Sequence, residues 1–480
     1  MAKVPDDVFF LSIPELNAKL QAREFSAVDL VRAFTDRLEQ VGPRYNALAL
    51  SLKETAIRAA KDVDTEMKRQ RFRGPLQGIP YAAKDLLAVK GQITTWGAKP
   101  YAAQVLDYDA TVLTKLSKTG ALLIGKLAMV ELAGGGGYIS TGASLFGPGL
   151  NPWDPGRWSG GSSSGSGSAV AAGLVPFALG SETNGSILTP SAFCGITGLR
   201  PTYGLVSRTG AMALSWSLDK IGPMCRSAEE CGLVLHEIAG GDNDDAGTAG
   251  KSFYFTPQFA RQMKDIKVGY APADFDTGVE PTTREAFQNA LRVMRDLGLQ
   301  LTPVKMPELP YGPVTSTIIF SEGASIFEEL ITSGQVDELA DRRQAAGLKA
   351  GLEIPARDYL KAQRIRRLVQ NAMRDLLTDV DVLLAPARTG IAPRIGDTLD
   401  RSRDYTAPAG DRGLRDLTPA GNLAGLPALA LPCGFVEKMP VGLQLVSRPF
   451  TENLILAIGM AFQKATDFHK QRPPGTRGVS

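Results

Sequence analysis

The sequence contains little histidine and little cysteine. Of its 480 residues only two are histidines, His236 and His469, so a histidine-rich metal site is excluded and no metal is predicted. The base that most serine hydrolases use therefore has only two candidates. The four cysteines lack CxxC spacing and are too few for a disulfide framework in a chain of this length. We expect buried free thiols at all four positions: Cys194, Cys225, Cys231 and Cys433.

Long apolar runs and an excess of one charge are also missing. No segment reaches the roughly 18 uninterrupted apolar residues of a membrane span, and the first residues, MAKVPDDVFF, lack the order of a secretory signal. We therefore expect a cytoplasmic protein that does not enter a membrane. The 53 basic and 50 acidic residues give a net charge of +3 and are spread along the chain, which leaves no footprint for nucleic acid. The densest basic run, Arg364–Arg367, is interpreted as a solvated helix face.

Short apolar runs alternate with helical patterns along the chain. Continuous apolar runs are typical of strands buried on both faces of a sheet, and we predict seven: Ile79–Leu87, Ala121–Leu127, Val175–Leu179, Ile266–Tyr270, Val380–Ala385, Ala428–Leu431 and Gly442–Val446. Apolar residues at three- and four-residue spacing predict helices between them: Ala228–Ala239, Pro281–Leu297, Arg357–Leu377 and Thr451–Phe468. The fold class is therefore α/β.

Two loops are candidates for a domain boundary, the acidic segment Gly240–Thr248 and the charged segment Asp397–Arg415. Apolar runs of the same type continue on both sides of each loop, so we predict a single domain over residues 1–480. From Ser12 to about Gln70 the pattern is helical and begins with a Ser and Pro start signal. Residues 1–70 are therefore predicted to form a helical region packed on the domain.

The segment Gly120–Lys126, GALLIGK, has the spacing of a phosphate-binding loop. Leu127 stands where that loop needs a Ser or Thr for Mg²⁺, and the segment follows a helical pattern instead of a strand. A nucleotide-binding protein is therefore only an alternative interpretation.

Two other motifs point to a nucleophilic serine. Gly161–Gly165 matches the GxSxG elbow and would make Ser163 the nucleophile, but a proline-broken loop precedes it where the elbow needs a strand. Its base would have to be a histidine, and we expect His469 in an exposed tail and His236 in an ordinary helix. Ser217–Lys220 matches SxxK but lacks the SDN and KTG partners of that class.

The Gly/Ser-rich run Gly160–Ser168 lies between a lysine in GIPYAAKDLL and a serine in SETNGSILTPS. Alone it would be read as a flexible linker, but it is followed directly by AVAAGLVPFALG, which predicts a buried helix and a buried strand. With these segments the chain resembles the amidase signature family of serine hydrolases over nearly its whole length. The resemblance is carried by GIPYAAKD, SGGSSSGSGSAVAAG and GSETNGSILTPSAFCGITGLRPTYG, and further by SLDKIGPMCRS, VDVLLAPA, NLAGLPALALPCG and GLQLV.

The resemblance implies a catalytic triad. Ser186 is the nucleophile, Ser162 is a bridging serine held by a cis peptide, and Lys84 is the base; the two serines are 24 residues apart, as in the family. A lysine can take a proton only when it is neutral, and with a pKa near 10.4 roughly one lysine in a thousand is neutral at about pH 7.4. Burial in the apolar segment around Lys84 would lower this pKa. The alternative is a surface lysine beside Asp85.

The residues Thr183, Asn184, Gly185 and Ser186 form a short loop before a predicted helix start. Their backbone N–H groups are candidates for the oxyanion hole. Asn184 and Leu188 replace the glycine and arginine of the commoner family pattern. That arginine can hold a carboxylate in relatives with small substrates, so Leu188 predicts a neutral or apolar acyl group.

Two further replacements bear on the substrate. Ala128 and Val130 replace the polar members of the family's Asn-Met-Asp run, which argues against a glutamine-using amidotransferase subunit. Met129, Leu188 and Trp216 are candidates for an apolar substrate pocket, with ordinary core packing as the alternative for each. Parts of residues 134–150 and 311–344 are expected to shape this pocket.

The resemblance further implies an α/β/α domain, in which a mixed β-sheet lies between helical layers, and an amidase that needs no cofactor. We predict hydrolysis of a neutral, apolar or aryl amide or carbamate through an acyl-enzyme, with esters as a further class. The expected partner is this small-molecule substrate, without nucleic acid or membrane, and a homodimer is left open. The alternatives are an amidotransferase A-type subunit, which would need a partner protein and tRNA, and a non-catalytic or nucleotide-binding protein.

Overall fold

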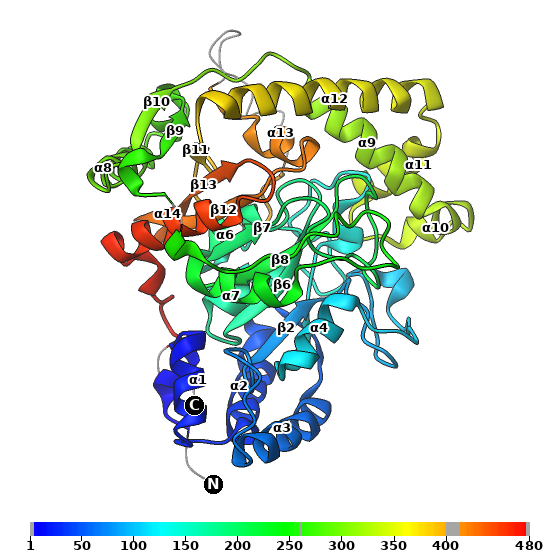
Figure 1. Ribbon diagram of the computed structural model, residues 1–480. Helices are drawn as coiled ribbons and strands as arrows, with labels where there is room; N and C mark the ends of the chain where they lie inside the picture. Colours follow the sequence, from blue (N-terminus) through cyan, green and yellow to red (C-terminus); the bar gives the residue numbers. More distant parts are fainter. Residues whose placement is uncertain (1–3, 260, 400–412, 477–480) are drawn as a thin grey trace.

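The computed structural model describes residues 4–259, 261–399 and 413–476 (Figure 1). Within these residues, one mixed sheet of 11 strands has the order β1-β3-β2-β6-β8-β7-β12-β13-β11-β9-β10. Its strands are β1 (Leu48–Ser51), β2 (Pro80–Lys84), β3 (Leu122–Leu127), β6 (Phe177–Glu182), β7 (Thr197–Arg200), β8 (Lys220–Cys225), β9 (Lys267–Tyr270), β10 (Gln300–Pro303), β11 (Val382–Pro386), β12 (Ala428–Val436) and β13 (Met439–Ser447). A separate hairpin pairs β4 (Leu150–Asn151) with β5 (Asp154–Trp158).

The sheet is parallel in two places and antiparallel elsewhere. Strand β2 runs parallel to β3 and β6, and β9 runs parallel to β10 and β11. The strands between these groups, from β6 through β8, β7, β12 and β13 to β11, pair antiparallel. Strands from residue 48 to residue 447 thus share one sheet.

Helices cover both faces of the sheet. They are α1 (Ile13–Gln21), α2 (Ala27–Val41), α3 (Lys53–Lys68), α4 (Thr111–Thr119), α5 (Ser164–Ala171), α6 (Leu188–Cys194), α7 (Ala228–Ile238), α8 (Arg284–Asp296), α9 (Tyr311–Ile326), α10 (Glu328–Thr332), α11 (Arg342–Leu352), α12 (Ala356–Asp379), α13 (Leu417–Leu423) and α14 (Glu452–Thr466). Leu429 of β12 packs against α14 at Gly459, whereas Gly442 of β13 faces Ala192 of α6 from the opposite side of the pleat. Helix α7 packs beside α14, and α5 beside α6.

The predicted class, α/β with a mixed central sheet between helical layers, is confirmed. All seven predicted strands and all four predicted helices are present, with ends that differ by a few residues. Ser12 forms the predicted helix start: its hydroxyl accepts the N–H of Glu15, and its own N–H donates to the Glu15 carboxylate at 2.7 Å. The helical pattern from Ser12 to Gln70 is wrong at Leu48–Ser51, because these residues are the edge strand β1.

The phosphate-loop interpretation of Gly120–Lys126 is wrong. Gly120 ends helix α4 in a left-handed conformation (φ 83°), and the residues that follow it are strand β3. The Lys126 side chain is fully buried, and its Nζ lies 2.7 Å from the carboxylate of the equally buried Asp85. The ammonium that would bind phosphate therefore balances an internal carboxylate instead.

Ser163 and Ser217, the serines of the GxSxG and SxxK motifs, form hydrogen bonds with structural partners. Ser163 is fully buried, and its hydroxyl donates to the carbonyl of Ser181 at 3.3 Å. Ser217 donates to the carboxylate of Glu322 at 2.7 Å, whereas Lys220 donates to the Leu218 carbonyl.

Neither histidine supplies a base to these serines. His236 is an exposed residue of α7 whose ring bonds the Phe253 carbonyl at 3.0 Å. His469 is half-buried in a short 3-10 helix, Phe468–Lys470, and not in an exposed tail. Burial lowers the pKa of His469 to about 4.

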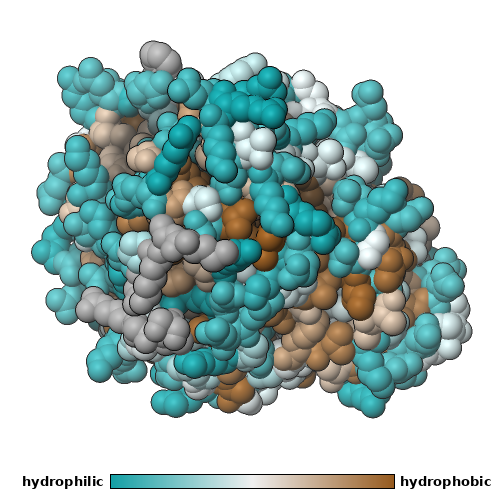
Figure 2. All heavy atoms as spheres, turned by 90° about the horizontal axis from the view of Figure 1, so that it is seen from below, coloured by the Kyte–Doolittle hydropathy of each residue, from teal (hydrophilic) through white to brown (hydrophobic). Residues whose placement is uncertain are grey.

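The cysteines and the helices bear on the expectations of free thiols and of a chain without a membrane span. All four cysteines are buried free thiols, as predicted. Of the helices formed by the described residues, none has the length and apolar character of a membrane span. Viewed from the end that carries α1, α2 and α3, the surface is mainly hydrophilic with separate apolar groups (Figure 2).

The Lys126–Asp85 pair predicts a large stability effect. Removing one partner of a buried ion pair leaves an uncompensated buried charge, so Lys126→Ala should lower the free energy of unfolding by about 3–5 kcal/mol. Urea denaturation followed by circular dichroism measures this change. The matched control is Lys349→Ala, which breaks an exposed pair with Asp337 and should cost less than about 1 kcal/mol. Equal effects of the two variants would contradict the structural role of Lys126.

Candidate active site

The candidate site lies where two parallel strands end side by side. Lys84 is the last residue of β2, and the neighbouring strand β6 ends at Glu182. The chain then turns through residues 183–187 into α6. Ligand sites in open α/β sheets form beyond the carboxyl ends of such strands, and this topology brings the predicted lysine to the loop that carries Ser186.

The Lys84 ammonium group is sealed from solvent and contacts two hydroxyl groups. Its Nζ lies 2.6 Å from Ser162 Oγ and 3.0 Å from Ser181 Oγ. Burial lowers the pKa of Lys84 to about 7, against the opposing effect of the carboxylates of Asp219 and Glu182. About half of the lysine is then neutral near pH 7, so it can accept a proton. Lys84 is therefore not the surface lysine of the alternative interpretation.

The segment around Ser162 connects the lysine to the Ser186 loop. The peptide bond between Gly161 and Ser162 is cis, and the Ser162 carbonyl accepts the N–H of Val130 at 3.0 Å. The next N–H, of Ser163, donates to the carbonyl of Ser186 at 3.3 Å. Lys84, Ser162 and Ser186 are thus brought to one site. Lys84 and Ser162 are fully buried, whereas Ser186 keeps 7% of its surface exposed, which suits a nucleophile in front of a sealed relay.

The predicted oxyanion loop has free N–H groups. Within the described residues no hydrogen bond uses the backbone N–H of Asn184, Gly185 or Ser186, whereas the next two, of Ile187 and Leu188, donate to the Glu182 carboxylate at 2.9 and 3.0 Å. Gly185 has φ +91°, a conformation that favours glycine. Asn184 has no positive φ, so the side chain that replaces a family glycine there causes no backbone strain.

Glu182 fixes the shape of this loop from the side of the buried core. Its side chain is fully buried, pairs with Arg200 at 2.9 Å and accepts the Asn422 amide at 3.0 Å. Burial acts to raise the pKa of Glu182, but Arg200, Asn422 and Lys220 lower it overall. A carboxylate that remains charged in the core can accept four hydrogen bonds, two of them from the loop backbone.

A second carboxylate supports the start of the loop. Asp219 accepts the Thr183 hydroxyl at 2.6 Å and the N–H groups of Leu214 and Ser215 at 2.8 and 2.9 Å. Burial raises the pKa of Asp219, and these hydrogen bonds oppose that shift. Neither Asp219 nor Glu182 was predicted from the sequence.

Two cavities contact different residues of the loop, and the three predicted pocket residues do not share one of them. The larger, about 690 Å³, is lined by Leu188 together with Asn184 and Gly185. The smaller, about 200 Å³, is lined by Trp216 together with Ser181 and Thr183. Met129 is fully buried in the main hydrophobic core and lines neither of these cavities.

The expected loops around the pocket are partly helical. The range 311–344 contains α9 and α10, and the first turns of α9 line the larger cavity with Gly312, Pro313 and Ser316. Tyr138, from the range 134–150, lines the same cavity. Part of the charged segment Asp397–Arg415, from residue 400 to 412, lies outside the described residues. Elsewhere in the described chain, no group of three or more His, Cys, Asp or Glu side chains is placed to hold a metal ion.

The site agrees with the resemblance found in the sequence. It combines a buried lysine, a serine on a cis peptide and a second serine on a strand-to-helix loop. A family model described as Amidase matches residues 29–456. The chain belongs to the amidase family. The amidase match thus includes every residue of the candidate site.

Known relatives of this amidase have different names. It is 37% identical to the A-type subunit of the glutamyl-tRNA(Gln) amidotransferase of Carboxydothermus hydrogenoformans, over 97% of this chain and 99% of that protein. The native peptide amidase of Stenotrophomonas maltophilia is 29% identical, with a TM-score of 0.83 over 98% of this chain and 100% of that chain. A bacterial aryl acylamidase has a TM-score of 0.84 at 23% identity, over 97% of this chain and 99% of that chain, and therefore shares the fold.

Sequence reasoning about the amidase missed the groups around the triad. Ser181 lies in the same segment as Ser186, but the predicted strand ended at Leu179 and so left Ser181 outside the sheet. The signal that could have found it is topological, because Lys84 ends β2 and Ser181 lies near the end of the neighbouring parallel strand β6. Glu182 carries no signal of its own, since its partners Arg200 and Asn422 are distant in the sequence.

The depressed pKa of Lys84 predicts a pH dependence. Only neutral Lys84 can accept the proton of the attacking serine, so the rate of fluorophosphonate labelling of the enzyme should rise with pH and level off above about pH 7. The measurement is the second-order labelling rate between pH 5.5 and 9, with circular dichroism to show that the fold persists. Lys84→Ala should lose the pH-dependent rise. A labelling rate that is still rising at pH 9 would show that the pKa of Lys84 is not depressed.

Proposed function

We propose that this amidase hydrolyses the C–N bond of a neutral amide through an acyl-enzyme on Ser186. Ser162 and Lys84 are proposed as its proton relay. The observation that carries the proposal is the 2.6 Å contact between the fully buried Lys84 and Ser162. This contact supplies a base to a site at which neither histidine of the chain is placed to serve.

In the proposed reaction, Ser186 Oγ attacks the amide carbonyl carbon. Its proton passes to Ser162 while the Ser162 proton passes to the neutral Lys84 amine. The charge on the carbonyl oxygen is stabilised by the free N–H groups of Asn184, Gly185 and Ser186, and removal of one such donor typically costs about 10²–10³ in rate.

The relay then runs backwards. Lys84 returns its proton to Ser162, Ser162 protonates the leaving nitrogen, and the C–N bond breaks to release the amine. A water molecule deprotonated by the same relay hydrolyses the ester on Ser186, which releases the carboxylic acid and restores the free serine. Every step uses side chains of this chain and needs no cofactor.

The larger cavity supports an apolar acyl group. Leu188 and Phe193 line it beside the loop, and Leu188 replaces an arginine of the commoner family pattern. The wall also includes two acidic and two basic residues, so it offers no excess of one charge: Asp274, Glu280, Arg388 and Arg415. Asn184 also lines this cavity, and its amide oxygen is buried without a hydrogen-bond partner among the described residues.

An amidotransferase subunit is the second candidate function. It is favoured by the 37% identity to proteins of that name over 97% of this chain. Against it stand Ala128 and Val130, both buried, where the family run has polar residues; Val130 packs in one apolar cluster with Trp158. Amide hydrolysis by the isolated protein would support the amidase. An enzyme that hydrolyses glutamine and no other amide, and does so only when a partner protein is present, would support the amidotransferase subunit.

Covalent labelling tests the nucleophile. A fluorophosphonate should label the wild-type protein and Ser163→Ala, whereas Ser186→Ala should lose labelling completely because the attacking oxygen is gone. Intact-protein mass spectrometry gives the adduct, and peptide mapping gives its position. Labelling that survives in Ser186→Ala and disappears in Ser163→Ala would replace this proposal with the GxSxG elbow, and a wild-type protein that is not labelled would point to an inactive member of the family.

A hydrolysis screen tests the substrate class. Aryl amides and apolar primary amides should be hydrolysed faster than amides whose acyl group carries a carboxylate, because Leu188 offers that carboxylate no cation. Carbamates and esters belong in the same screen, measured by release of amine or alcohol. Equal rates for neutral and carboxylate-bearing acyl groups would contradict the predicted preference.

A further inference from the structure

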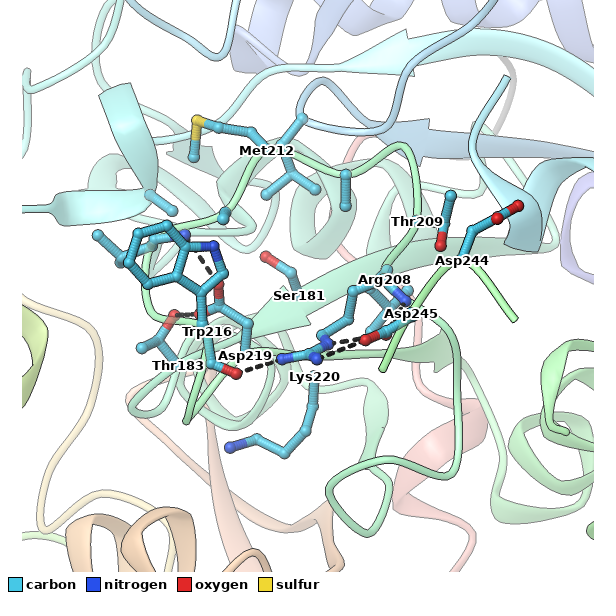
Figure 3. A pocket seen from close by; sticks show the side chains of 16 residues that line it. Ser181, Thr183, Arg208, Thr209, Met212, Trp216, Asp219, Lys220, Asp244 and Asp245 are labelled. Atoms are coloured by element: carbon cyan, nitrogen blue, oxygen red, sulfur yellow. Dashed lines mark hydrogen bonds and ion pairs between the residues drawn. The ribbon is translucent and has the colours of Figure 1, made fainter. Parts of the chain in front are cut away.

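The smaller cavity adjoins the relay side of the loop. Its volume is about 200 Å³, and its wall includes Ser181 and Thr183. The Ser181 hydroxyl is the same group that lies 3.0 Å from Lys84 Nζ. In Figure 3, Ser181 lies in the middle of this cavity, with Met212 and the indole of Trp216 on one side and Arg208 and Asp245 on the other.

The two cavities contact different stretches of the same loop. The smaller one reaches residues 181 and 183, and the larger one reaches residues 184, 185, 188 and 189. An amide bound across Ser186 has two halves, which must lie in different directions from the carbonyl carbon. Ser186 itself lines neither cavity, but the residues around it contact two different spaces, and each space can receive one half of the amide.

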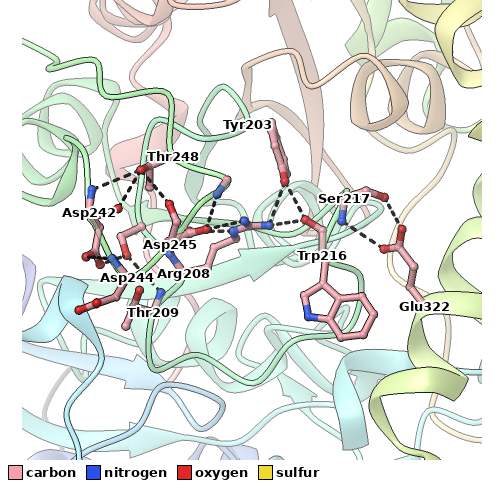
Figure 4. A network of polar contacts seen from close by, with 12 residues as sticks. Tyr203, Arg208, Thr209, Trp216, Ser217, Asp242, Asp244, Asp245, Thr248 and Glu322 are labelled. Atoms are coloured by element: carbon pink, nitrogen blue, oxygen red, sulfur yellow. Dashed lines mark hydrogen bonds and ion pairs between the residues drawn. The ribbon is translucent and has the colours of Figure 1, made fainter.

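Trp216 is an exposed aromatic side chain on a fixed backbone. Its indole is 53% exposed, yet its carbonyl accepts a hydrogen bond from Tyr203 Oη at 2.7 Å and another from Arg208 (Figure 4). The next residue, Ser217, donates its N–H and its hydroxyl to Glu322 at 3.1 and 2.7 Å. On the other side, the N–H of Ser215 donates to Asp219.

This arrangement lowers the entropic cost of binding an aromatic group against Trp216. A backbone held from both sides loses little freedom when a ligand covers the indole, and an exposed indole gains by burying its face. The neighbouring Arg208 guanidinium already donates to Asp245 at 3.0 and 2.7 Å. It is therefore committed to an internal carboxylate and offers no free cation to a ligand, although the wall of the cavity also includes the carboxylate of Asp244.

We infer that the smaller cavity binds the amine half of the substrate and that Trp216 stacks on an aromatic amine there. The inference rests on the proposed function and assigns the acyl half to the cavity lined by Leu188. Its chemical reason is the direction of proton transfer, because the leaving nitrogen must receive its proton from the Ser162–Lys84 relay. The cavity that contacts this relay through Ser181 is therefore on the amine side. The substrate class that follows is an anilide, which releases an arylamine.

The test compares three amides. Acetanilide and acetamide form the same acetyl-enzyme and differ only in the amine, whereas benzamide and acetamide release the same ammonia and differ only in the acyl group. The kcat/KM ratio of acetanilide to acetamide therefore reports on the amine side, and the ratio of benzamide to acetamide reports on the acyl side.

We expect Trp216→Ala to lower the acetanilide-to-acetamide ratio about tenfold, the size of a lost aromatic stacking contact with its buried area. The benzamide-to-acetamide ratio should stay within about twofold, and Trp216→Phe should recover most of the anilide preference. The control variant is Phe72→Ala, which removes an aromatic side chain of similar exposure, 52%, that lines neither cavity. It should leave both ratios unchanged.

Three results would overturn the inference: no effect of Trp216→Ala on the anilide ratio, an equal effect on the benzamide ratio, or wild-type hydrolysis of acetamide and benzamide but not of acetanilide. Failure of the proposed function gives a different result, since none of the three amides would be hydrolysed and Ser186 would not be labelled. Thermal unfolding of Trp216→Ala separates a loss of fold from a loss of selectivity.

Discussion

A lysine that must lose its charge is the constraint on which this structure depends. In the proposed reaction Lys84 can serve as a base because its side chain is fully buried, and neither cavity described above includes it in its wall. The carboxylates of Asp219 and Glu182 pull the pKa in the opposite direction. The site is thus a balance between desolvation and charge, in which a water molecule admitted beside Lys84 would restore the ordinary ammonium.

This constraint explains why the site is built in two layers. The proposed relay, Lys84 and Ser162, is fully buried, whereas the loop N–H groups that we propose meet the substrate, those of Asn184, Gly185 and Ser186, have no hydrogen-bond partner among the described residues. Glu182 anchors the loop to the core, because its carboxylate is paired with Arg200 and accepts two N–H groups at the end of the loop. A loop positioned by a buried charge reorganises little during the reaction, and this is the condition for electrostatic stabilisation of an oxyanion.

Much of the fold could be predicted from the sequence, because buried strands give apolar runs and surface helices give periodic ones. The segments that escaped prediction have physical reasons: β8 (KIGPMC) carries a lysine, a glycine and a proline inside a buried strand, and α9 has apolar residues all around its axis together with Gly312 and Pro313. The triad was implied by the family resemblance, and the structure brings its members together. Composition could not distinguish Met129 in the core from Leu188 and Trp216 at two different cavities, since that distinction depends on which way a side chain points from its backbone.

The ties of Glu182 and Arg200 reach far along the chain. Glu182 accepts from Asn422, 240 residues later, and Arg200 donates to the Leu426 carbonyl at 3.0 Å. The loop that carries Ser186 is therefore tied, through Glu182 and Arg200, to segments near the C-terminus. During synthesis, a chain that has emerged from the ribosome only as far as β11 already holds Lys84, Ser162 and Ser186. Such a nascent chain would lack the contacts of Glu182 and Arg200 with residues 422 and 426. We therefore expect it to have no active site until the C-terminal segment has folded.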